Sequence, residues 1–361
     1  MKPAPRSTLG PIRAVVCNFN GRAHLPPCLA ALRAQTRPLD GLIVVDNASE
    51  DGSREWLARE QPDVHVEAMG QNEGPCPARN RGLEVVEDEW VLLVDNDAVL
   101  APDALEKLER AALANPDAVL LQPRSVFDAQ PEVVHYDGGD LHYCGLFSLR
   151  NFHAPLARAA GFGTVEVGGA IAVALLAKRS VLRELGGFDP AYFVLFEDLD
   201  LSLRLRMAGH RILSVEDALC RHRGGTVGIS YRGSMDYPRR RAFLHSRNRW
   251  IHLLKNHSGR TLCLSAPALV GYELVWALFT LLSGTFAGYL QGKWAFLRGI
   301  SRTLGDRARV QRLRRVRDRD LLVGGPLTIA PQLDRGGARS FALRALDRAL
   351  RAWWTLVRPL C

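Results

Sequence analysis

Carboxylates follow two apolar runs in the first hundred residues. Asp46 ends an apolar run that begins at Leu42, and Asp95, Asn96 and Asp97 follow another. Two carboxylates spaced i, i+2 at the exit of a strand can share one hard cation, directly or through water. Such a cation bridges diphosphate oxygens and neutralises charge on a leaving nucleotide. A single acidic strand end is usually only a solvated turn. Two acidic strand ends, together with the carboxylates found later in the chain, instead favour a site for a metal and a nucleotide. In such a site Asp46 accepts hydrogen bonds from a base or ribose.

A second acidic cluster, Glu197, Asp198 and Asp200, begins a predicted helix. The helix dipole favours acids at this end, which is the structural explanation for Glu197 and Asp200. A general base must instead present its carboxylate within reach of an acceptor hydroxyl. Asp198 is our candidate for that role.

His222 comes after a later strand, in front of a glycine-bearing loop at residues 223–226. A single histidine is more often a surface or core residue than a metal ligand. Its place after a strand nevertheless allows it to complete the ligand set that Asp97 begins.

The segment from Asn72 to Gly82 enters a helix. Gly74 permits a close backbone approach, and the helix N-terminus together with Arg79 favours phosphate or a polar nucleotide group, although an ordinary helix entry explains most of this pattern. No G-x-G-x-x-G follows the first strand and no G-x-x-x-x-G-K-[ST] occurs. The sequence therefore argues against a nicotinamide dehydrogenase and against a P-loop enzyme.

The elements that position these residues alternate between short apolar runs and helical patterns. We expect strands at residues 12–19, 42–45, 64–68, 90–94, 170–176 and 212–215. We expect helices at residues 25–32, 77–86, 181–185 and 198–208. Two further helices are expected to begin at Ser53, as an N-cap, and at residue 102. This alternation predicts β-α-β units, a mainly parallel sheet, and ligand-binding loops along one edge of it. Between Val119 and Gly163 the pattern is irregular and glycine-containing, and we expect a loop-rich stretch.

The composition is that of a globular chain of 361 residues with a net charge of +9. A basic balance favours an anionic partner, but there is no nucleic-acid motif and the basic excess lies in the C-terminal part, so we expect no nucleic-acid binding. Seven scattered cysteines without a C-x-x-C pair indicate reduced thiols in a cytosolic compartment. No apolar run precedes Val15, so the sequence shows no signal peptide.

The stretch from Thr261 to Gly292 contains no Lys or Arg and one acid, Glu273. It is long enough for one spanning helix. Basic residues flank it on both sides, and the positive-inside tendency makes a single span unfavourable. We therefore expect a re-entrant pair or interfacial helices on an anionic membrane surface, with an apolar helix packed on the catalytic domain as the alternative.

Taken together, residues 12–256 resemble the family 2 glycosyltransferases with a GT-A fold, in particular their rhamnosyltransferase-like branch. The matching motifs occur in the family's order: Phe19-Asn20-Gly21, Asp46-Asn47-Ala48-Ser49-Glu50-Asp51-Gly52-Ser53, Asn72 with Gly74, Arg79, Asn80 and Gly82, Asp95-Asn96-Asp97, Gly186-Gly187-Phe188-Asp189, and Glu197-Asp198-Leu199-Asp200-Leu201 with Arg204. The sequence departs from the family at Asn18, where Thr or Ser is usual, and at Phe19, where Tyr is common; the loop of His222 also matches less closely.

The resemblance implies an α/β GT-A fold, Rossmann-like, with a mixed, mainly parallel sheet flanked by helices. It implies that Asp46 binds the nucleobase, that Asp95 touches ribose or metal, that Asp97 and His222 hold Mg²⁺ or Mn²⁺, and that Asp198 is the catalytic base. The other matched residues assigned to substrate binding are Asn20, Asn72, Arg79, Glu197 and Arg204.

The resemblance also implies an inverting transfer from a nucleotide-sugar donor, dTDP-rhamnose or a UDP-sugar, to a glycan or lipid-linked acceptor at the cytoplasmic side of the membrane, with the chain peripheral or re-entrant. We expect a catalytic domain at 1–258, with a nucleotide-binding half to about 118 and an acceptor half from about 119, and a helical membrane-associating tail at 259–361. A sugar nucleotidyltransferase and a non-catalytic nucleotide-sugar-binding relative are the alternatives.

Overall fold

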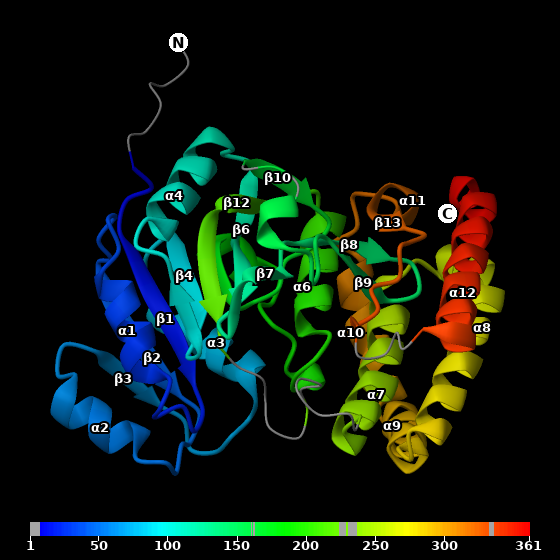
Figure 1. The fold of residues 1–361 in the computed structure, drawn as a ribbon, viewed down its shortest axis with the longest axis horizontal. Coiled ribbons are helices and arrows are strands. Elements are labelled where there is room, and N and C mark those ends of the chain that lie inside the picture. Colours follow the sequence, from blue (N-terminus) through cyan, green and yellow to red (C-terminus); the bar gives the residue numbers. More distant parts are fainter. Residues whose placement is uncertain (1–7, 160, 162, 224–228, 230–236, 332–335) are drawn as a thin grey trace. The chain divides into compact units, whose positions relative to one another are not determined.

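The computed structural model describes residues 8–159, 161, 163–223, 229, 237–331 and 336–361. The chain forms two compact units, and neither is continuous in sequence (Figure 1). The first comprises Met1–Gly138, Arg150–Leu201 and His210–Gly224, and the second comprises Gly139–Leu149, Ser202–Gly209 and Gly225–Cys361.

The first unit is a sheet flanked by helices. Its strands are β1 (Ile12–Asn18), β2 (Gly41–Asp46), β3 (His65–Ala68), β4 (Trp90–Asp95), β5 (Ala98–Leu100), β6 (Ala118–Phe127), β7 (Gln130–Tyr136), β10 (Thr164–Val167), β11 (Ala174–Lys178) and β12 (Arg211–His222). Its helices are α1 (Leu25–Arg33), α2 (Ser53–Glu60), α3 (Pro75–Val85), α4 (Ala104–Ala114), α5 (Arg179–Glu184), the 3₁₀ turn η2 (Pro190–Tyr192) and the first turn of α6 (Glu197–Met207).

The strand order of the sheet is β10-β12-β6-β11-β4-β1-β2-β3, with β5 beside β12 and β7 beside β6. β1, β2, β3 and β4 are parallel, β11 runs antiparallel between β4 and β6, and β12 is parallel to β6. The alternation of apolar runs with helical patterns therefore predicted the first half of the sheet correctly. β1, β2 and β4 are continuous apolar runs because helices cover them, and their side chains form the buried core with those of α1 and α4. The edge strand β3 is shorter and only partly buried.

The expectation of a loop-rich stretch between Val119 and Gly163 is wrong. β6 is a ten-residue strand buried along almost its whole length, although it contains Pro123, Arg124 and Ser125. Smaller differences occur elsewhere: the strand expected at 170–176 begins at Ala174, and Ser53 is the first residue of α2, whose N-cap is Gly52.

A buried ionic network explains why β6 does not look like a strand in the sequence. The guanidinium of Arg124 pairs with Asp137 at 2.9 Å and with Glu216 at 3.2 Å, and all three side chains are fully buried. Asp137 also accepts hydrogen bonds from Ser214 at 3.0 Å and Asn151 at 2.6 Å. Burial of a charge is tolerated when it is paired and hydrogen-bonded, so these polar residues replace the apolar ones that a pattern search needs.

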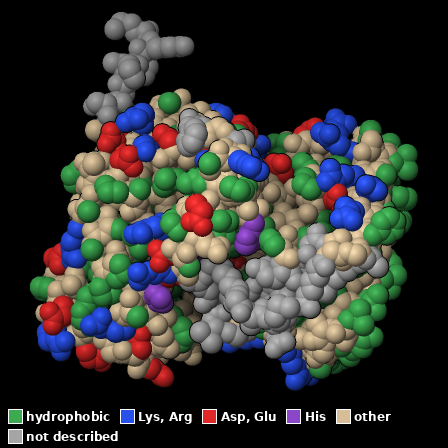
Figure 2. Space-filling model, viewed as in Figure 1, with side chains coloured by type: hydrophobic (Ala, Val, Ile, Leu, Met, Phe, Trp, Pro, Cys, Tyr) green, Lys and Arg blue, Asp and Glu red, His purple; other side chains and the backbone are tan. Residues whose placement is uncertain are grey.

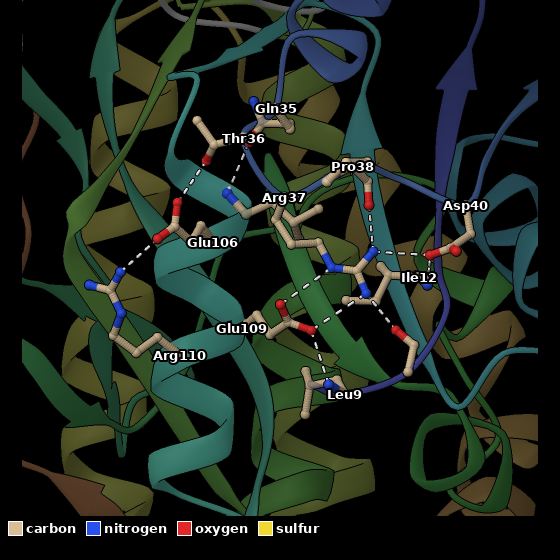
Figure 3. A network of polar contacts seen from close by, with 12 residues as sticks. Leu9, Ile12, Gln35, Thr36, Arg37, Pro38, Asp40, Glu106, Glu109 and Arg110 are labelled. Carbon is tan, nitrogen blue, oxygen red and sulfur yellow. Dashed lines mark hydrogen bonds and ion pairs between the residues drawn. The ribbon is translucent and has the colours of Figure 1, made fainter. Parts of the chain in front are cut away.

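A second polar network fixes the amino end of β1 (Figure 3). Arg37 contacts Asp40 at 3.0 Å and Glu109 of α4 at 3.3 Å. The Asp40 carboxylate accepts the backbone N–H of Ile12 at 2.8 Å, and Glu109 accepts that of Leu9 at 3.0 Å. The entry to β1 and the loop before β2 are thereby fastened to α4, at the end of the sheet opposite to the acidic strand ends.

The second unit is mainly helical. It contains α7 (Arg239–Asn256), α8 (Gly259–Leu282), α9 (Phe286–Arg298), α10 (Ile300–Gln311), α11 (Asp318–Leu321), α12 (Gly337–Val357) and a small sheet of β8 (Gly139–His142), β9 (Leu146–Leu149) and β13 (Leu322–Val323). Arg249 of α7 is buried and donates to the carbonyl of Cys144 at 2.8 Å, and the ring of Tyr143 stacks on Trp354. Segments that are far apart in sequence therefore share one core in this unit.

We predict that Asp137→Ala lowers the free energy of unfolding by about 3–5 kcal/mol, because removal of one partner breaks a buried ion pair. Denaturant unfolding measures this change. Asp117→Ala is the matched control, since it removes an exposed partner of Arg211 and should cost about 0–1 kcal/mol. A loss below about 1 kcal/mol for Asp137→Ala would contradict the role given to the network.

Candidate active site

The register of the parallel strands brings the acidic strand ends together. Cys17 of β1 pairs with Asp95 of β4, and Asn18 pairs with Asp46 of β2. The three strands therefore end at the same level, at the edge of an open α/β sheet where ligands bind. Asp46 and Asp95 therefore lie at one edge of the sheet, the edge at which ligand-binding loops were predicted.

Asn18 connects the two acidic ends. Its amide donates to Asp46 at 2.8 Å, and its carbonyl oxygen accepts from Asn96 at 2.7 Å. Asp46 is fully buried and also accepts from the backbone N–H of Ser49 at 3.0 Å and from Arg54 at 2.6 Å. Burial opposes ionisation, but these hydrogen bonds outweigh it and hold the pKa of Asp46 below its usual value. Arg54, Asn18, and both the side chain and the backbone N–H of Ser49 therefore donate to this carboxylate.

Asn20 and Asn72 belong to turns beside these strand ends. The carbonyl oxygen of Asn20 accepts from the backbone N–H of Glu50 at 2.8 Å. Asn47 donates to the side chain of Asn72 and to the carbonyl of Gly74, each at 3.0 Å. Asn20 has a positive φ of 49°, which is uncommon for a residue other than glycine. These asparagines therefore set the shape of the loops around the crevice.

The motif that leads into α3 has a separate contact for each of its main residues. A side chain at Gly74, whose φ is +88°, would meet Phe193 at 2.8 Å. The amide of Asn80 exchanges hydrogen bonds with the backbone of Phe188 at 2.7 and 2.8 Å. A Cβ at Gly82 would lie 2.2 Å from Val15. The motif thus fastens α3 to β1 on one side and to the segment before α6 on the other.

Arg79 is the buried cation of the crevice. Its guanidinium contacts Asp95 at 2.8 Å, the carbonyl of Ala172 at 3.1 Å and Glu197 at 3.7 Å, and it lies 5.1 Å from the ring centre of Phe188. The acids that end β4 and those that begin α6 are consequently held within the span of one side chain.

Asp95, Asp97 and His222 form a group that could hold a metal ion, because one ligand atom from each lies within 4.8 Å of the others. Nε2 of His222 lies 3.2 Å from the Asp97 carboxylate. Burial would raise the pKa of Asp97, but the hydrogen bond and charge of His222 outweigh it and lower that pKa. Burial raises the pKa of Asp95, and the nearby Asp97 raises it further despite Arg79. Two carboxylates that disfavour each other's charge are suited to a divalent cation.

His135 was not found from the sequence. Its Nδ1 lies 3.1 Å from Nδ1 of His222, and its buried ring lies against Phe127 and Tyr136. A hydrogen bond at Nδ1 fixes both the orientation and the tautomer of a histidine, and leaves Nε2 free to bind a metal. His135 belongs to β7, in the stretch that was expected to be irregular, so no pattern drew attention to it.

Glu197 and Asp198 begin α6 with raised pKa values. Burial and, after it, the neighbouring Asp198 raise the pKa of Glu197 to about 8, although Arg79 opposes the shift. Burial also raises the pKa of Asp198 to about 6, against the charge of Arg79 and a hydrogen bond with the backbone of Ala172. At neutral pH Asp198 is therefore mostly ionised and Glu197 mostly protonated. Asp198 is half-buried, and its Oδ1 has no hydrogen-bond partner among the described residues.

The segment before α6 is conformationally strained. Phe193, Leu195 and Phe196 have φ values of 62°, 68° and 77°. Positive φ costs such bulky residues about 1–3 kcal/mol each, and such strain often marks functional sites. Asp200 is fully buried and accepts a hydrogen bond from Tyr192 at 3.0 Å, so it supports this segment from within.

Arg204 and the glycine-bearing loop after His222 were also predicted from the sequence. Arg204 is buried on α6, in the part of that helix that belongs to the second unit, six residues after Asp198. Six residues turn a helix by about 600°, so the two side chains occupy different faces. The glycines at 224 and 225 in the loop after His222 lie outside the described residues.

Comparisons with known proteins agree with this geometry. The family model "Glycosyl transferase family 2" matches residues 14–186. An N-acetylglucosaminyl-diphospho-decaprenol L-rhamnosyltransferase of Mycobacterium tuberculosis is 28% identical over 266 residues, 68% of this chain and 84% of that protein. The O-antigen chain rhamnosyltransferase WbaN of Salmonella anatum is 28% identical over 213 residues, 58% of this chain and 64% of that protein. The structure of GalNAc-T7 with UDP, GalNAc and Mn²⁺ superposes with a TM-score of 0.55 at 15% identity, over 72% of this chain and 51% of that one.

The fold is therefore GT-A, as the motifs predicted. Residues 14–186 match the family 2 glycosyltransferase model, and together with the relatives this match supports an inverting glycosyltransferase that uses nucleotide-sugars. The alternative of a sugar nucleotidyltransferase is not supported by these relatives.

We predict that Asp198→Asn lowers the transfer rate by about 10²-fold or more while donor affinity changes little, because general-base catalysis typically contributes that factor. With a pKa of about 6, the base is lost as pH falls through 6, so kcat/KM of the parent enzyme should decrease below that pH. A pH profile of both variants tests this. Near-parental turnover of Asp198→Asn would transfer the role of base to another acid.

We also predict that His135→Phe weakens Mn²⁺ binding by about 10–100-fold, the usual effect of losing a group that orients a metal ligand. Phenylalanine keeps the ring packing and removes the nitrogen. Titration of free Mn²⁺ by electron paramagnetic resonance gives the affinity independently of activity. His65→Phe on β3, where the histidine is exposed, is the control. Equal affinity in the two variants would show that His135 has only a packing role.

Proposed function

We propose that the chain transfers a sugar from dTDP-rhamnose or a UDP-sugar to a hydroxyl group of a glycan or lipid-linked acceptor. Two observations support this. The mycobacterial relative is named as a rhamnosyltransferase acting on a lipid diphosphate, and the Salmonella anatum relative is named as an O-antigen rhamnosyltransferase. The product would then be a precursor of a cell-envelope polysaccharide.

In the proposed reaction Asp198 takes the proton of the acceptor hydroxyl. The acceptor oxygen forms a bond to the anomeric carbon as the bond from that carbon to the diphosphate oxygen breaks, and one displacement inverts the anomeric configuration. The Oδ1 of Asp198, which has no hydrogen-bond partner among the described residues, carries this assignment, since it can accept a proton. The pKa of about 6 supports it, because a carboxylate that is ionised at neutral pH yet more basic than usual is suited to this proton transfer. Protonated Glu197 can donate a hydrogen bond beside it.

On the donor side we propose that Asp46 receives the nucleobase and that Asn20 and Asn72 shape the loops around the nucleotide. Arg79 would offset the charge of the acids while the diphosphate binds. Arg204 stays a proposed substrate residue, acting from its own part of α6. Such positioning and electrostatic stabilisation are the main contributions an enzyme of this kind makes.

Asp95, Asp97 and His222 fit a divalent cation, since two hard oxygen donors and an imidazole converge there. We propose Mg²⁺ or Mn²⁺. When bound, the cation supplies neutralisation of the charge that develops on the leaving nucleoside diphosphate.

We propose that the reaction takes place at the cytoplasmic side of a membrane. The mycobacterial relative and a glucosyl-dolichyl phosphate glucuronosyltransferase of Haloferax volcanii carry names with lipid-linked acceptors. α8 is long and apolar enough to cross a membrane. In functional terms we keep the division into a catalytic part at 1–258 and a membrane-associating part at 259–361.

The test is release of nucleoside diphosphate from a panel of dTDP-, UDP- and GDP-sugars, each with and without Mn²⁺ and with a short-chain lipid diphosphate acceptor. Release that needs the acceptor, with inverted product configuration, supports transfer. Binding of donors without any release would instead identify a non-catalytic nucleotide-sugar-binding protein.

We predict that Asp97→Ala abolishes transfer and removes the dependence of donor binding on Mn²⁺, because the cation loses one of its three ligands. Calorimetric titration of the donor with and without Mn²⁺ measures this. Asp128→Ala, which removes an acid paired with Arg223 outside the metal group, is the control. If Mn²⁺ still strengthens donor binding to Asp97→Ala, the metal assignment is wrong.

A further inference from the structure

The exposed apolar side chains of the molecule gather in the second unit. Apart from Phe19, every exposed large hydrophobic residue among the described residues lies on α8, α9, α10, α12 or the turn η4 (Arg358–Leu360). In Figure 2 hydrophobic side chains line the right-hand margin, where Figure 1 places α8 and α12. We call these outward faces of α8, α9, α10 and α12 the apolar face.

α8 carries the most continuous part of this face. Its first turn exposes Gly259 and Arg260, and beyond that turn the exposed residues recur every three or four positions: Cys263, Ala266, Pro267, Val270, Leu274, Val275, Leu278, Leu281 and Leu282. None of these nine residues is charged. The buried side of the same helix holds three hydroxyl side chains, Thr261, Ser265 and Thr280, together with Ala268, Leu269 and Trp276. A water-exposed helix turns its polar side to solvent, whereas the exposed side of α8 is apolar beyond its first turn.

Basic side chains border the apolar face. Trp294 of α9 is exposed, and the guanidinium of Arg298 lies 5.4 Å from its ring centre. On α10, Arg302 and Arg309 are exposed beside Ile300 and Leu304, and on α12 Arg344, Arg348 and Arg351 are exposed. Tryptophan and arginine together are typical of the level between lipid head groups and hydrocarbon.

A hollow of about 300 Å³ opens among α7, α8, α9 and the start of α10. Its lining is entirely apolar or aromatic, with Leu254, Leu262, Leu269 and Phe296 among the side chains. Val270 and Ile300 belong both to this lining and to the apolar face. The hollow therefore continues the face inward, and a hydrocarbon chain is the chemistry that fits it.

The inner side of α8 argues against a helix that crosses the bilayer. Glu273, near the middle of α8, forms ion pairs with Arg249 of α7 at 2.8 Å and with Lys293 of α9 at 2.5 Å. A crossing helix would carry this cluster to the centre of the hydrocarbon, where charged groups are strongly disfavoured. It would also separate α8 from α7 and α9, with which its buried residues pack.

We infer that the second unit lies flat on an anionic lipid bilayer, with the apolar face inserted among the acyl chains and the arginines at the head groups, and that α8 does not cross. This inference rests on the proposed membrane-facing function and names the surface and the partner. Attraction of arginine to anionic lipid and burial of apolar area act together in such interfacial binding.

The first experiment uses the full chain and flotation with vesicles of phosphatidylcholine, with and without phosphatidylglycerol. The triple variant Leu274→Glu, Leu278→Glu, Leu282→Glu changes only exposed side chains, so it should fold. We expect its partitioning to anionic vesicles to fall by more than about tenfold. The control Ala30→Glu, Ala58→Glu, Ala114→Glu adds the same charge at exposed helical positions of the first unit and should float like the parent chain.

The second experiment distinguishes lying from crossing. Spin labels are placed on the exposed thiol of Cys263 and, separately, on Val270→Cys, Leu274→Cys and Leu281→Cys. A flat helix gives nearly equal depths at the four sites. A crossing helix gives depths that change steadily over about 27 Å, the rise of 18 residues.

Equal flotation of the triple variant and the control would overturn the inference, as would a steady depth gradient. A soluble dimer of the parent chain that the triple variant abolishes, without vesicle binding, would assign the apolar face to self-association instead. Donor-dependent release of nucleoside diphosphate is measured on the same variants. Vesicle binding without sugar transfer would retain the inference and reject the proposed function. Sugar transfer without vesicle binding would retain the proposed function and reject the inference.

Discussion

In the active crevice, one guanidinium offsets the charge of three carboxylates that are partly or fully buried. Asp95, Glu197 and Asp198 come from strand and helix ends that the fold brings to the same place, and their mutual repulsion would oppose folding. Arg79 contacts the first two and lowers the pKa of the third. The segments that carry Arg79 and the acids are in turn joined by hydrogen bonds of Asn80, so the charge balance is built into the backbone arrangement rather than left to mobile side chains.

The part of the fold that could be predicted from the sequence is the part whose burial is apolar. β1, β2 and β4 are continuous apolar runs, and their alternation with helices identified the parallel half of the sheet. β6 could not be found in this way, because Arg124 satisfies its buried charge through Asp137 and Glu216, residues distant in sequence. A hydrophobicity pattern identifies segments that are buried because their side chains are apolar. It does not identify a segment whose buried side chains are charged and paired.

The acids of the site could be predicted from the sequence because a carboxylate at the end of a strand or at the start of a helix is well placed to bind a metal or a ligand. Asp46, Asp95, Asp97 and Asp198 were identified on that basis. Asn18 and His135 act only through the residues they contact, and such a role has no local sequence signal. The family resemblance also did not supply it, since Asn18 is where this chain departs from the usual Thr or Ser.

The interleaving of the two units in the sequence affects how the protein can be synthesised. β8 lies in the first half of the chain, yet its parallel neighbour β13 follows about 180 residues later. At roughly 5–20 residues per second, the ribosome delivers that partner about 10–40 s after β8 has emerged. The nascent hairpin of β8 and β9 must wait with an open edge during this time. A chain released before β13 is made would keep this unpaired edge, and correct folding of the second unit therefore depends on synthesis at least as far as β13.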